Sequence, residues 1–191
     1  FAAKERLPHV DYRAFCPSFP GENMEGLVNA AIRSGCNLVR YDNLNKMLDK
    51  EKPDILVVDN IFTERFPAEK IALSRGIHVY ADKPIATSAA DLNDLYRTAV
   101  KNTAIIWAMH TMRYDSPFYT AKLLVEQGAV GKVRMVNCQK SYRLGIRPSF
   151  YSDRNTYGGT ILWVAIHGID LIRMITGCEF KSVYSLQSGA D

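Results

Sequence analysis

Cysteine is scarce and scattered in this 191-residue chain, and this excludes several classes of protein. The four cysteines show no CxxC motif and no paired spacing, so we expect neither a disulfide framework nor a metal site. Isolated thiols beside apolar segments behave as small hydrophobic side chains. Reduced cysteines of this kind are typical of a cytoplasmic protein, which is the localisation we expect.

Long apolar runs and concentrated charge of one sign are also missing. No segment reaches the ~18 apolar residues that a membrane-spanning helix needs, and no signal peptide is visible, so we expect no membrane association. The net charge of +4 is mild, and the basic residues are dispersed rather than gathered on one face. Nucleic-acid binding is therefore not expected either. The apolar fraction of 47% is that of an ordinary globular protein.

Short apolar runs alternate with helical patterns through the first half of the chain. The run Asp54–Asp59 is almost continuously apolar, which is typical of a strand covered on both faces. This alternation predicts an α/β fold whose parallel sheet carries helices on both faces. We expect strands over 10–16, 37–41, 54–59, 77–81 and 104–109, and helices over 22–33, 44–50, 67–74 and 88–101.

The second half has a different pattern, so we place a domain boundary near residue 109. The domains are then 1–108 and 109–191. Helical patterns cover 117–127 and 160–176, the second after Gly158-Gly159. Alternation over Lys132–Leu144, and the apolar run 180–186, predict strands. The tyrosine-rich stretch 150–157 is either a pocket wall or a subunit contact.

Polar residues follow two of the predicted parallel strands. Asn60 comes after the strand over 54–59, and Asp82-Lys83-Pro84 follows the strand over 77–81. Ligands of open α/β sheets bind outside the carboxyl ends of the strands. Partial burial there could lower the pKa of Lys83, so that it acts as an acid or base. The alternative is that Lys83 is an ordinary solvated loop lysine.

The helix over 160–176 brings a second group of polar residues together. Trp163, His167 and Asp170 share one face because they are spaced by four and three residues. One interpretation is that this face is the solvent-facing side of an amphipathic helix. The other is that His167 lines a pocket as a proton donor or acceptor supported by Asp170. Arg113 and Tyr142 either contact a polyol or cofactor phosphate or are surface and packing residues.

Three motifs, in this order, resemble one enzyme family. They are GIHVYADKPIA at 76–86, MRYD at 112–115 with GAVGKV at 128–133, and GGT at 158–160 followed by HGIDLI at 167–172. The set is similar to that of the glucose-fructose oxidoreductase / inositol dehydrogenase (Gfo/Idh/MocA) family of nicotinamide-dependent oxidoreductases. The likeness covers nearly the whole chain.

The resemblance implies a Rossmann dinucleotide-binding domain followed by an α/β domain with an open, mainly antiparallel sheet. It implies hydride transfer between NAD(P) and a sugar, polyol or related small molecule, in a homodimer or homotetramer. Lys83 would contact the substrate hydroxyl and the nicotinamide ribose, His167 would move the hydroxyl proton, and Asp170 would support it. The expected cofactor-binding residues are Ser18, Asn60, Asp82, Lys83, Pro84 and Arg113, and the expected substrate contacts are Lys83, Tyr142, Trp163 and His167.

The sequence departs from the family pattern at three places. The first strand and glycine-rich phosphate loop are absent, so we expect the sequence to be incomplete at that end. No acidic residue follows the strand that ends at Phe15-Cys16-Pro17-Ser18, which favours NADP over NAD. Trp163 stands where many members have an aspartate. Because an indole cannot transfer a proton, the alternative is a non-catalytic nucleotide-binding or regulatory protein of the same fold.

Overall fold

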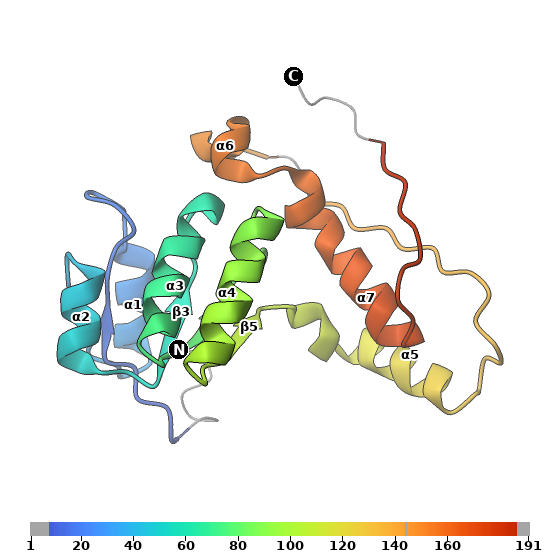
Figure 1. Cartoon of the computed structure of the whole chain (residues 1–191), viewed down its shortest axis with the longest axis horizontal. Helices are drawn as coiled ribbons and strands as arrows, with labels where there is room; N and C mark the ends of the chain where they lie inside the picture. The colour runs from blue at the N-terminus through green and yellow to red at the C-terminus, as the bar shows by residue number, and fades with distance from the viewer. Residues whose placement is uncertain (1–7, 144, 187–191) are drawn as a thin grey trace. The chain divides into compact units, whose positions relative to one another are not determined.

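The computed structural model describes residues 8–143 and 145–186, and these form two compact units. The first unit holds the described residues up to Met109 together with Pro148–Gly158. The second holds His110–Arg147 and the described residues from Gly159 onward. Figure 1 shows the elements of both units along the chain, and each unit is described by itself.

Strands and helices alternate in the first unit, which confirms the predicted α/β class. All of its strand pairs are parallel, in one sheet of β1 and β2 and another in the order β3-β4-β5. The elements are β1 (Ala14–Phe15), α1 (Glu25–Arg33), β2 (Val39–Arg40), α2 (Leu44–Glu51), β3 (Ile55–Val58), η2 (Phe62–Glu64), α3 (Arg65–Ser74), β4 (His78–Ala81), α4 (Ala89–Lys101), β5 (Ile106–Ala108), η4 (Ser149–Ser152) and α6 (Arg154–Tyr157).

Two helices of this unit begin at side-chain caps that the sequence makes visible. Asn43 Oδ1 accepts a hydrogen bond of 3.0 Å from the backbone N–H of Lys46 at the start of α2. Ser88 Oγ accepts one of 3.0 Å from the N–H of Asp91 at the start of α4. Each cap satisfies a backbone donor that a helix leaves without an internal partner. The predicted helix starts at 44 and 88 therefore agree with the structure to within a residue.

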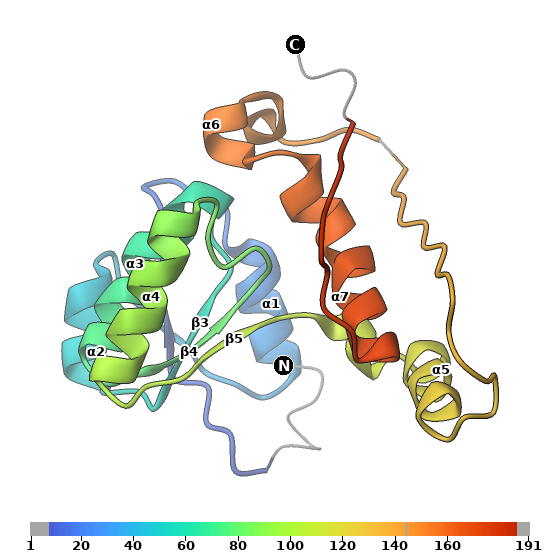
Figure 2. The same ribbon diagram turned by 45° about the vertical axis from the view of Figure 1, so that its right-hand side comes forward.

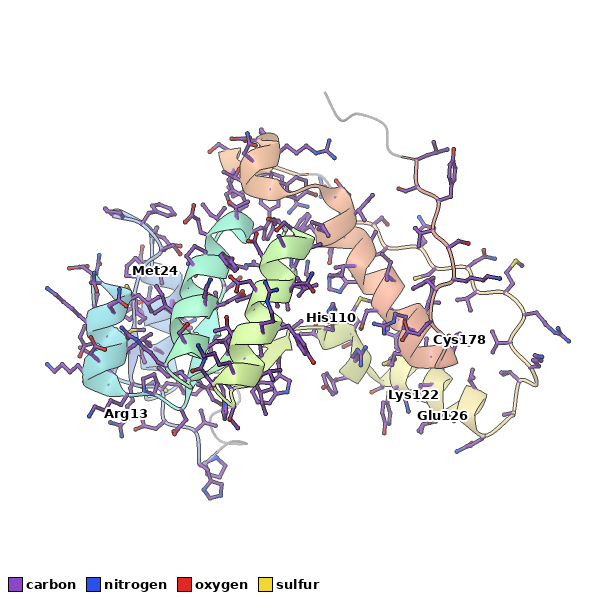
Figure 3. The ribbon with its side chains drawn as sticks, viewed as in Figure 1. Arg13, Met24, His110, Lys122, Glu126 and Cys178 are labelled. Carbon is purple, nitrogen blue, oxygen red and sulfur yellow. The ribbon has the colours of Figure 1, made fainter. Side chains whose placement is uncertain are left out.

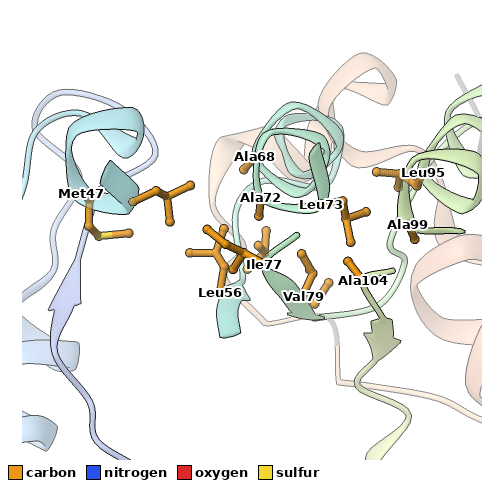
Figure 4. Close-up of a cluster of buried hydrophobic side chains, with 13 residues drawn as sticks. Met47, Leu56, Ala68, Ala72, Leu73, Ile77, Val79, Leu95, Ala99 and Ala104 are labelled. Atoms are coloured by element: carbon orange, nitrogen blue, oxygen red, sulfur yellow. The ribbon is translucent and has the colours of Figure 1, made fainter. Parts of the chain in front are cut away.

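The core of the first unit lies between the three-stranded sheet and the helices α3 and α4. These two helices run side by side along the same face of the sheet (Figures 1 and 2). Figure 4 shows Leu56 and Val79 of the sheet beneath Ala72 and Leu73 of α3, with Leu95 reaching in from α4. Burial of such aliphatic side chains supplies most of the stabilisation of a domain of this kind.

The other face of the three-stranded sheet is open at its centre. Val57, Tyr80 and Trp107 lie side by side in register across β3, β4 and β5, with 55%, 40% and 44% of their surfaces exposed. Leu56 and Val58, on the opposite side of β3, are buried. The expectation that both faces of this strand are covered is therefore wrong at Val57, which is more than half exposed.

The second unit is helical in its described residues. It comprises η3 (Thr111–Tyr114), α5 (Ser116–Glu126), the π-helical turn η5 (Ile161–Ala165) and α7 (Ile166–Thr176). Helices α5 and α7 pack against each other. On α5, Lys122 and Glu126, both labelled in Figure 3, form an ion pair of 2.5 Å one turn apart.

The strands predicted in this unit are not formed. The described parts of 132–144 and 180–186 make no ladder, and Leu144 lies outside the described residues. The mainly antiparallel sheet therefore has no counterpart in the residues that the structure describes. Alternating apolar residues favour a strand, but a strand also needs a partner for its backbone groups.

Cys138 packs closely on α7, where a Cβ at Gly168 would lie 3.2 Å from its Sγ.

One helical stretch passes a simple test for membrane spans. Arg154–Thr176 is 23 residues long and contains an 18-residue window with a mean hydropathy of 1.3, which is enough to cross a membrane by length and composition only. The expectation that no segment is long and apolar enough is therefore wrong by these two measures. The core helix of a protein that enters no membrane passes the same test, so the finding is weak support for a span.

Candidate cofactor and substrate site

The polar residues predicted at the strand ends are brought together in the first unit. Val58 and Ala81 are paired in the parallel ladder, and the N–H of Asp82 donates to Val58 O at 2.9 Å. The residues that follow the two strands, including Asn60 and Lys83, therefore emerge at neighbouring points on one edge of the sheet. That edge is where ligands of open α/β sheets bind.

Lys83 is buried, with 6% of its surface exposed, and it precedes a cis peptide bond to Pro84. The alternative that Lys83 is an ordinary solvated loop lysine is therefore wrong. Its neighbour Asp82 is partly exposed, and Pro84 is buried. A buried ammonium group fixed at a strand end can hydrogen-bond an oxygen that gains negative charge during a reaction.

Arg65 is the residue of this edge that sequence reasoning missed. Its side chain is buried and reaches the backbone on both sides of Lys83. A sequence signal for the burial of Arg65 was present in the spacing of residues along helix α3. Arg65, Glu69, Ala72 and Leu73 follow the spacing of a buried helical stripe, so two charged residues occupy core positions.

Glu69 is fully buried one turn along α3 from Arg65. Neither of its carboxyl oxygens has a hydrogen-bond partner among the described residues. Burial raises the pKa of Glu69 to about 8, although the positive charge of Arg65 acts in the opposite direction. The side chain is therefore mostly protonated at neutral pH, because an ionised carboxylate is strongly disfavoured without water or partners.

An acidic side chain lies at the end of β1, although it comes from Glu22, four residues beyond Ser18. The backbone N–H of Ser18 donates to Glu22 Oε2 at 2.6 Å. Ser18 itself is exposed. The turn between β1 and α1 thus folds a carboxylate back toward the strand end, where a Rossmann domain distinguishes the ribose hydroxyls of its dinucleotides.

In the second unit, Asp170 of α7 is held by a basic residue of the segment that follows β5. Arg113 Nε donates to Asp170 Oδ2 at 2.7 Å, and Nη2 donates to Oδ1 at 2.6 Å. These hydrogen bonds raise the pKa of the Arg113 guanidinium. His110 Nδ1 lies 3.8 Å from the same carboxylate. Support of His167 by Asp170, and contact of Arg113 with a cofactor, stay predictions.

His167 is buried on α7, and Trp163 lies four residues earlier, at the π-helical turn. The Trp163 ring stacks on Tyr142 with centroids 5.4 Å apart and planes at 29°. The guanidinium of Arg147 lies 5.1 Å from the centre of the Trp163 ring. The two predicted substrate contacts, Tyr142 and Trp163, are therefore neighbours, and they belong to a cluster with a positive charge.

The structure thus brings the predicted residues together as two sets, one in each unit. Asn60, Asp82, Lys83 and Pro84 form the first set, and Ser18 stands apart from them at the end of β1. Arg113 and Asp170 are bonded in the second set, and Tyr142 stacks on Trp163. Across 8–143 and 145–186, no group of three histidine, cysteine, aspartate or glutamate side chains could hold a metal ion.

Comparison with known protein families agrees with these two units. Residues 22–110 match the family model described as "Oxidoreductase family, NAD-binding Rossmann fold". Residues 118–190 match the "GFO/IDH/MocA C-terminal domain". The chain belongs to the Gfo/Idh/MocA family of oxidoreductases, and its first unit is a Rossmann-type domain.

Individual relatives support the same assignment. The uncharacterized oxidoreductase C115.03 of Schizosaccharomyces pombe is 27% identical over 157 residues, which are 80% of this chain and 42% of that protein. Myo-inositol 2-dehydrogenase of Thermotoga maritima is 27% identical over 108 residues, which are 56% of this chain and 31% of that protein. The chain spans less than half the length of these curated relatives.

Solved structures show the same fold. A Thermotoga maritima structure assigned to the oxidoreductases superposes with a TM-score of 0.83 and 44% identity, covering 90% of this chain and 54% of that one. The WlbA dehydrogenase of Bordetella pertussis, solved with NADH and UDP-GlcNAcA, has a TM-score of 0.71 and 22% identity. It covers 91% of this chain and 50% of that one, and its likeness concerns the fold alone.

Proposed function

We propose that this chain is part of an oxidoreductase that transfers a hydride between NAD(P) and a sugar, a polyol or a related hydroxy or keto compound. One observation carries the proposal. Asn60 and the Asp82-Lys83-Pro84 segment follow paired parallel strands of a Rossmann-type domain, and Lys83 is buried at that edge. Family membership supplies the reaction class.

The first unit provides the binding surface for the dinucleotide. Asn60, Asp82 and Pro84 line this surface, Ser18 lies at the end of β1, and the cofactor supplies or accepts the hydride when bound. Lys83 positions and polarises the substrate oxygen through its ammonium group, which stabilises a developing alkoxide. A lysine fixed in this way acts throughout the reaction without a conformational search.

The second unit provides the proton-transfer group and the substrate contacts. His167 takes the hydroxyl proton during oxidation and returns it during reduction, which suits an imidazole because its pKa lies near neutrality. Asp170 supports this histidine, and Arg113 holds Asp170. Tyr142 and Trp163 present aromatic surface to the substrate.

The choice between NAD and NADP depends on the turn after β1. The lack of an acidic residue directly after the strand favours NADP, whereas the Glu22 carboxylate bonded to Ser18 favours NAD. Assembly as a homodimer or homotetramer, and residence in the cytoplasm, are further parts of the proposal. They rest on the family resemblance and on the dispersed cysteines.

A second candidate function is that of a non-catalytic nucleotide-binding or regulatory protein of the same fold, used for regulation or assembly. Trp163 favours it, because an indole occupies a position where family members often carry an aspartate and cannot transfer a proton. Its contacts with Tyr142 and Arg147 give the ring a packing role that needs no chemistry.

A fluorescence titration of the whole protein with NADH and with NADPH tests the proposal. Saturable binding of one of them supports the oxidoreductase and identifies the cofactor, and a screen of sugars and polyols for turnover then separates the enzyme from the non-catalytic alternative. A folded protein that binds neither dinucleotide would contradict the oxidoreductase and favour a non-catalytic, regulatory protein.

A further inference from the structure

Arg65 joins the backbone at the ends of two neighbouring strands. Its Nε donates to the carbonyl of Asn60 at 2.9 Å, and Nη1 donates to the carbonyls of Asp82 and Pro84, each at 3.0 Å. The last two carbonyls flank Lys83 on either side. One guanidinium therefore fixes both the segment after β3 and the residues immediately around the lysine.

The remaining donors of Arg65 point at carboxylates of the same two segments. Nη2 lies 3.1 Å from Asp82 Oδ2 and 3.5 Å from Asp59 Oδ1. Only a guanidinium can serve several acceptors in different directions from one rigid plane. A lysine ammonium is a single point with three donors, so the two cations are not interchangeable here.

The guanidinium is also held on its flat side. It lies 4.6 Å from the centre of the Phe62 ring, a cation–π contact. Phe62 in turn packs within about 6 Å, centre to centre, on three rings of the tyrosine-rich stretch: Phe150, Tyr151 and Tyr157. These rings therefore hold Phe62, and with it the flat face of the Arg65 guanidinium, within the first unit.

The hydrogen bonds and ion pairs of Arg65 go to residues that follow β3 and β4, and none goes to Glu69 of its own helix. Glu69 lies one turn away but makes no hydrogen bond or ion pair with it, and burial keeps that carboxyl mostly protonated at neutral pH. Asp82, Asp59 and the three carbonyls are thus the acceptors that stabilise the charge of Arg65, a residue that is only 1% exposed. Removal of Arg65 would leave those acceptors without their donor.

We propose that Arg65 is a positioning residue that holds Lys83 in place by joining the backbone carbonyls on both sides of it to the end of β3. The part of this proposal that concerns catalysis rests on the proposed function. The part that concerns the placement of Lys83 does not, and it can be tested in a protein of any activity.

The test measures how fast Lys83 is acetylated by a soluble N-hydroxysuccinimide ester in the full chain and in two variants, Arg65→Lys and Arg65→Ala. Tryptic digestion isolates the site, since the peptide Gly76–Arg97 contains Lys83 as its one lysine and trypsin does not cleave before proline. We expect Lys83 to react at least about tenfold faster in both variants, because the local opening that exposes it becomes easier. The exposed Lys101 serves as the internal reference and should react equally in all samples.

Arg75→Ala is the matched control variant. Arg75 lies at the other end of α3 and bonds to Asn45 and Asp49 of the α2 region, so its loss should leave the labelling of Lys83 unchanged. An unchanged Lys83 rate in a folded Arg65→Lys variant would overturn the proposal. So would unfolding of Arg65→Lys, because it would show that Arg65 holds the whole unit rather than the loop around Lys83.

A second arm separates this proposal from the proposed function. We expect Arg65→Lys to weaken binding of NADH or NADPH by the whole protein about tenfold, because the segments around Asn60 and Asp82 shift together. If the unsubstituted protein binds neither dinucleotide while the labelling result holds, the proposed function fails and the positioning role stands. If binding is strong and Lys83 labelling does not respond to Arg65, the positioning role fails alone.

Discussion

Arg113 and Asp170 lie 57 residues apart in the chain and form a two-point ion pair, with Nε–Oδ2 and Nη2–Oδ1 distances of 2.7 and 2.6 Å. The Asp170 side chain is 10% exposed and that of Arg113 is 40% exposed. The pair joins the segment after β5 to the helix that carries His167. It therefore sets where α7 lies within the second unit.

Arg113→Ala should lower the free energy of unfolding by about 2 kcal/mol, between the values typical of exposed and buried pairs, because it leaves a buried carboxylate without its donor. Arg113→Lys should lose about half as much, since an ammonium cannot reproduce the two-point geometry. Urea unfolding measures both. The exposed pair of Lys122 and Glu126 provides the control, and Lys122→Ala should change stability by less than about 0.5 kcal/mol. Equal effects at the two sites would show that the buried pair is no stronger than a surface one.

Glu69 should make the stability of the protein fall as pH rises. Its pKa is about 8 in the folded state against 4.5 for an ordinary glutamate, so between these values the unfolded chain loses a proton that the folded chain keeps. Ionisation then favours the unfolded state, by at most about 5 kcal/mol at pH 8 and above.

Glu69→Gln removes this ionisation, so its stability relative to the unsubstituted protein should rise from pH 5 to pH 8, as measured by urea unfolding at each pH. Glu64→Gln, at an exposed position next to the start of α3, should show no such trend. A difference between the Glu69 variant and the unsubstituted protein that stays constant across this range would mean that Glu69 ionises normally in the folded protein.

Local patterns predicted most of the fold of the first unit, because the signals that begin and end helices act over a few residues. Ser88 caps α4 at the expected helix start of 88, and the left-handed Gly76 follows the expected helix end at 74. The predicted order of strands and helices is confirmed. What the pattern could not supply was the partner of each strand, so the alternation over Lys132–Leu144 predicted a strand that the described residues do not form.

The candidate site was predicted in part, and its missing member shows why. Lys83 was found because it follows a buried strand in a recognisable motif. Arg65 was missed because an arginine at the start of a helix usually lies in solvent, and only the fold shows its contacts with residues 17 and 19 positions later. The spacing along α3 puts Arg65 on the buried stripe of the helix, but it does not show which distant acceptors would stabilise a buried charge there.

Glu22 should influence which dinucleotide is bound. Its carboxylate is fixed on the backbone N–H of Ser18, at the end of β1, where it would repel the 2′-phosphate of NADP. Glu22→Gln keeps an acceptor oxygen and removes the charge, so the ratio of NADPH to NADH affinity should rise about tenfold in fluorescence titrations of the whole protein. Glu25→Gln, at the exposed start of α1, is the control. An unchanged ratio in the Glu22 variant would remove this carboxylate from cofactor selection.

Lys83→Ala and His167→Ala should each reduce kcat/KM at least about 100-fold, which is the usual contribution of a positioned acid or base. The two variants should differ in their other properties, because the residues have different roles. If Lys83 contacts both the substrate and the nicotinamide ribose as proposed, its loss should also lower dinucleotide affinity. If His167 transfers the proton as proposed, its loss should leave dinucleotide affinity within about threefold and should change the pH dependence of kcat/KM.

These assays use whichever sugar or polyol the substrate screen identifies, with Lys101→Ala as a control on an exposed helix surface. Near-normal turnover in a folded His167 variant would assign the proton to another group, and His110 would be the next to test because its ring lies 3.8 Å from Asp170. Near-normal turnover in the Lys83 variant would be more damaging. It would mean that the buried lysine, with the Arg65 contacts on both sides of it, serves the packing of the strand ends rather than the reaction.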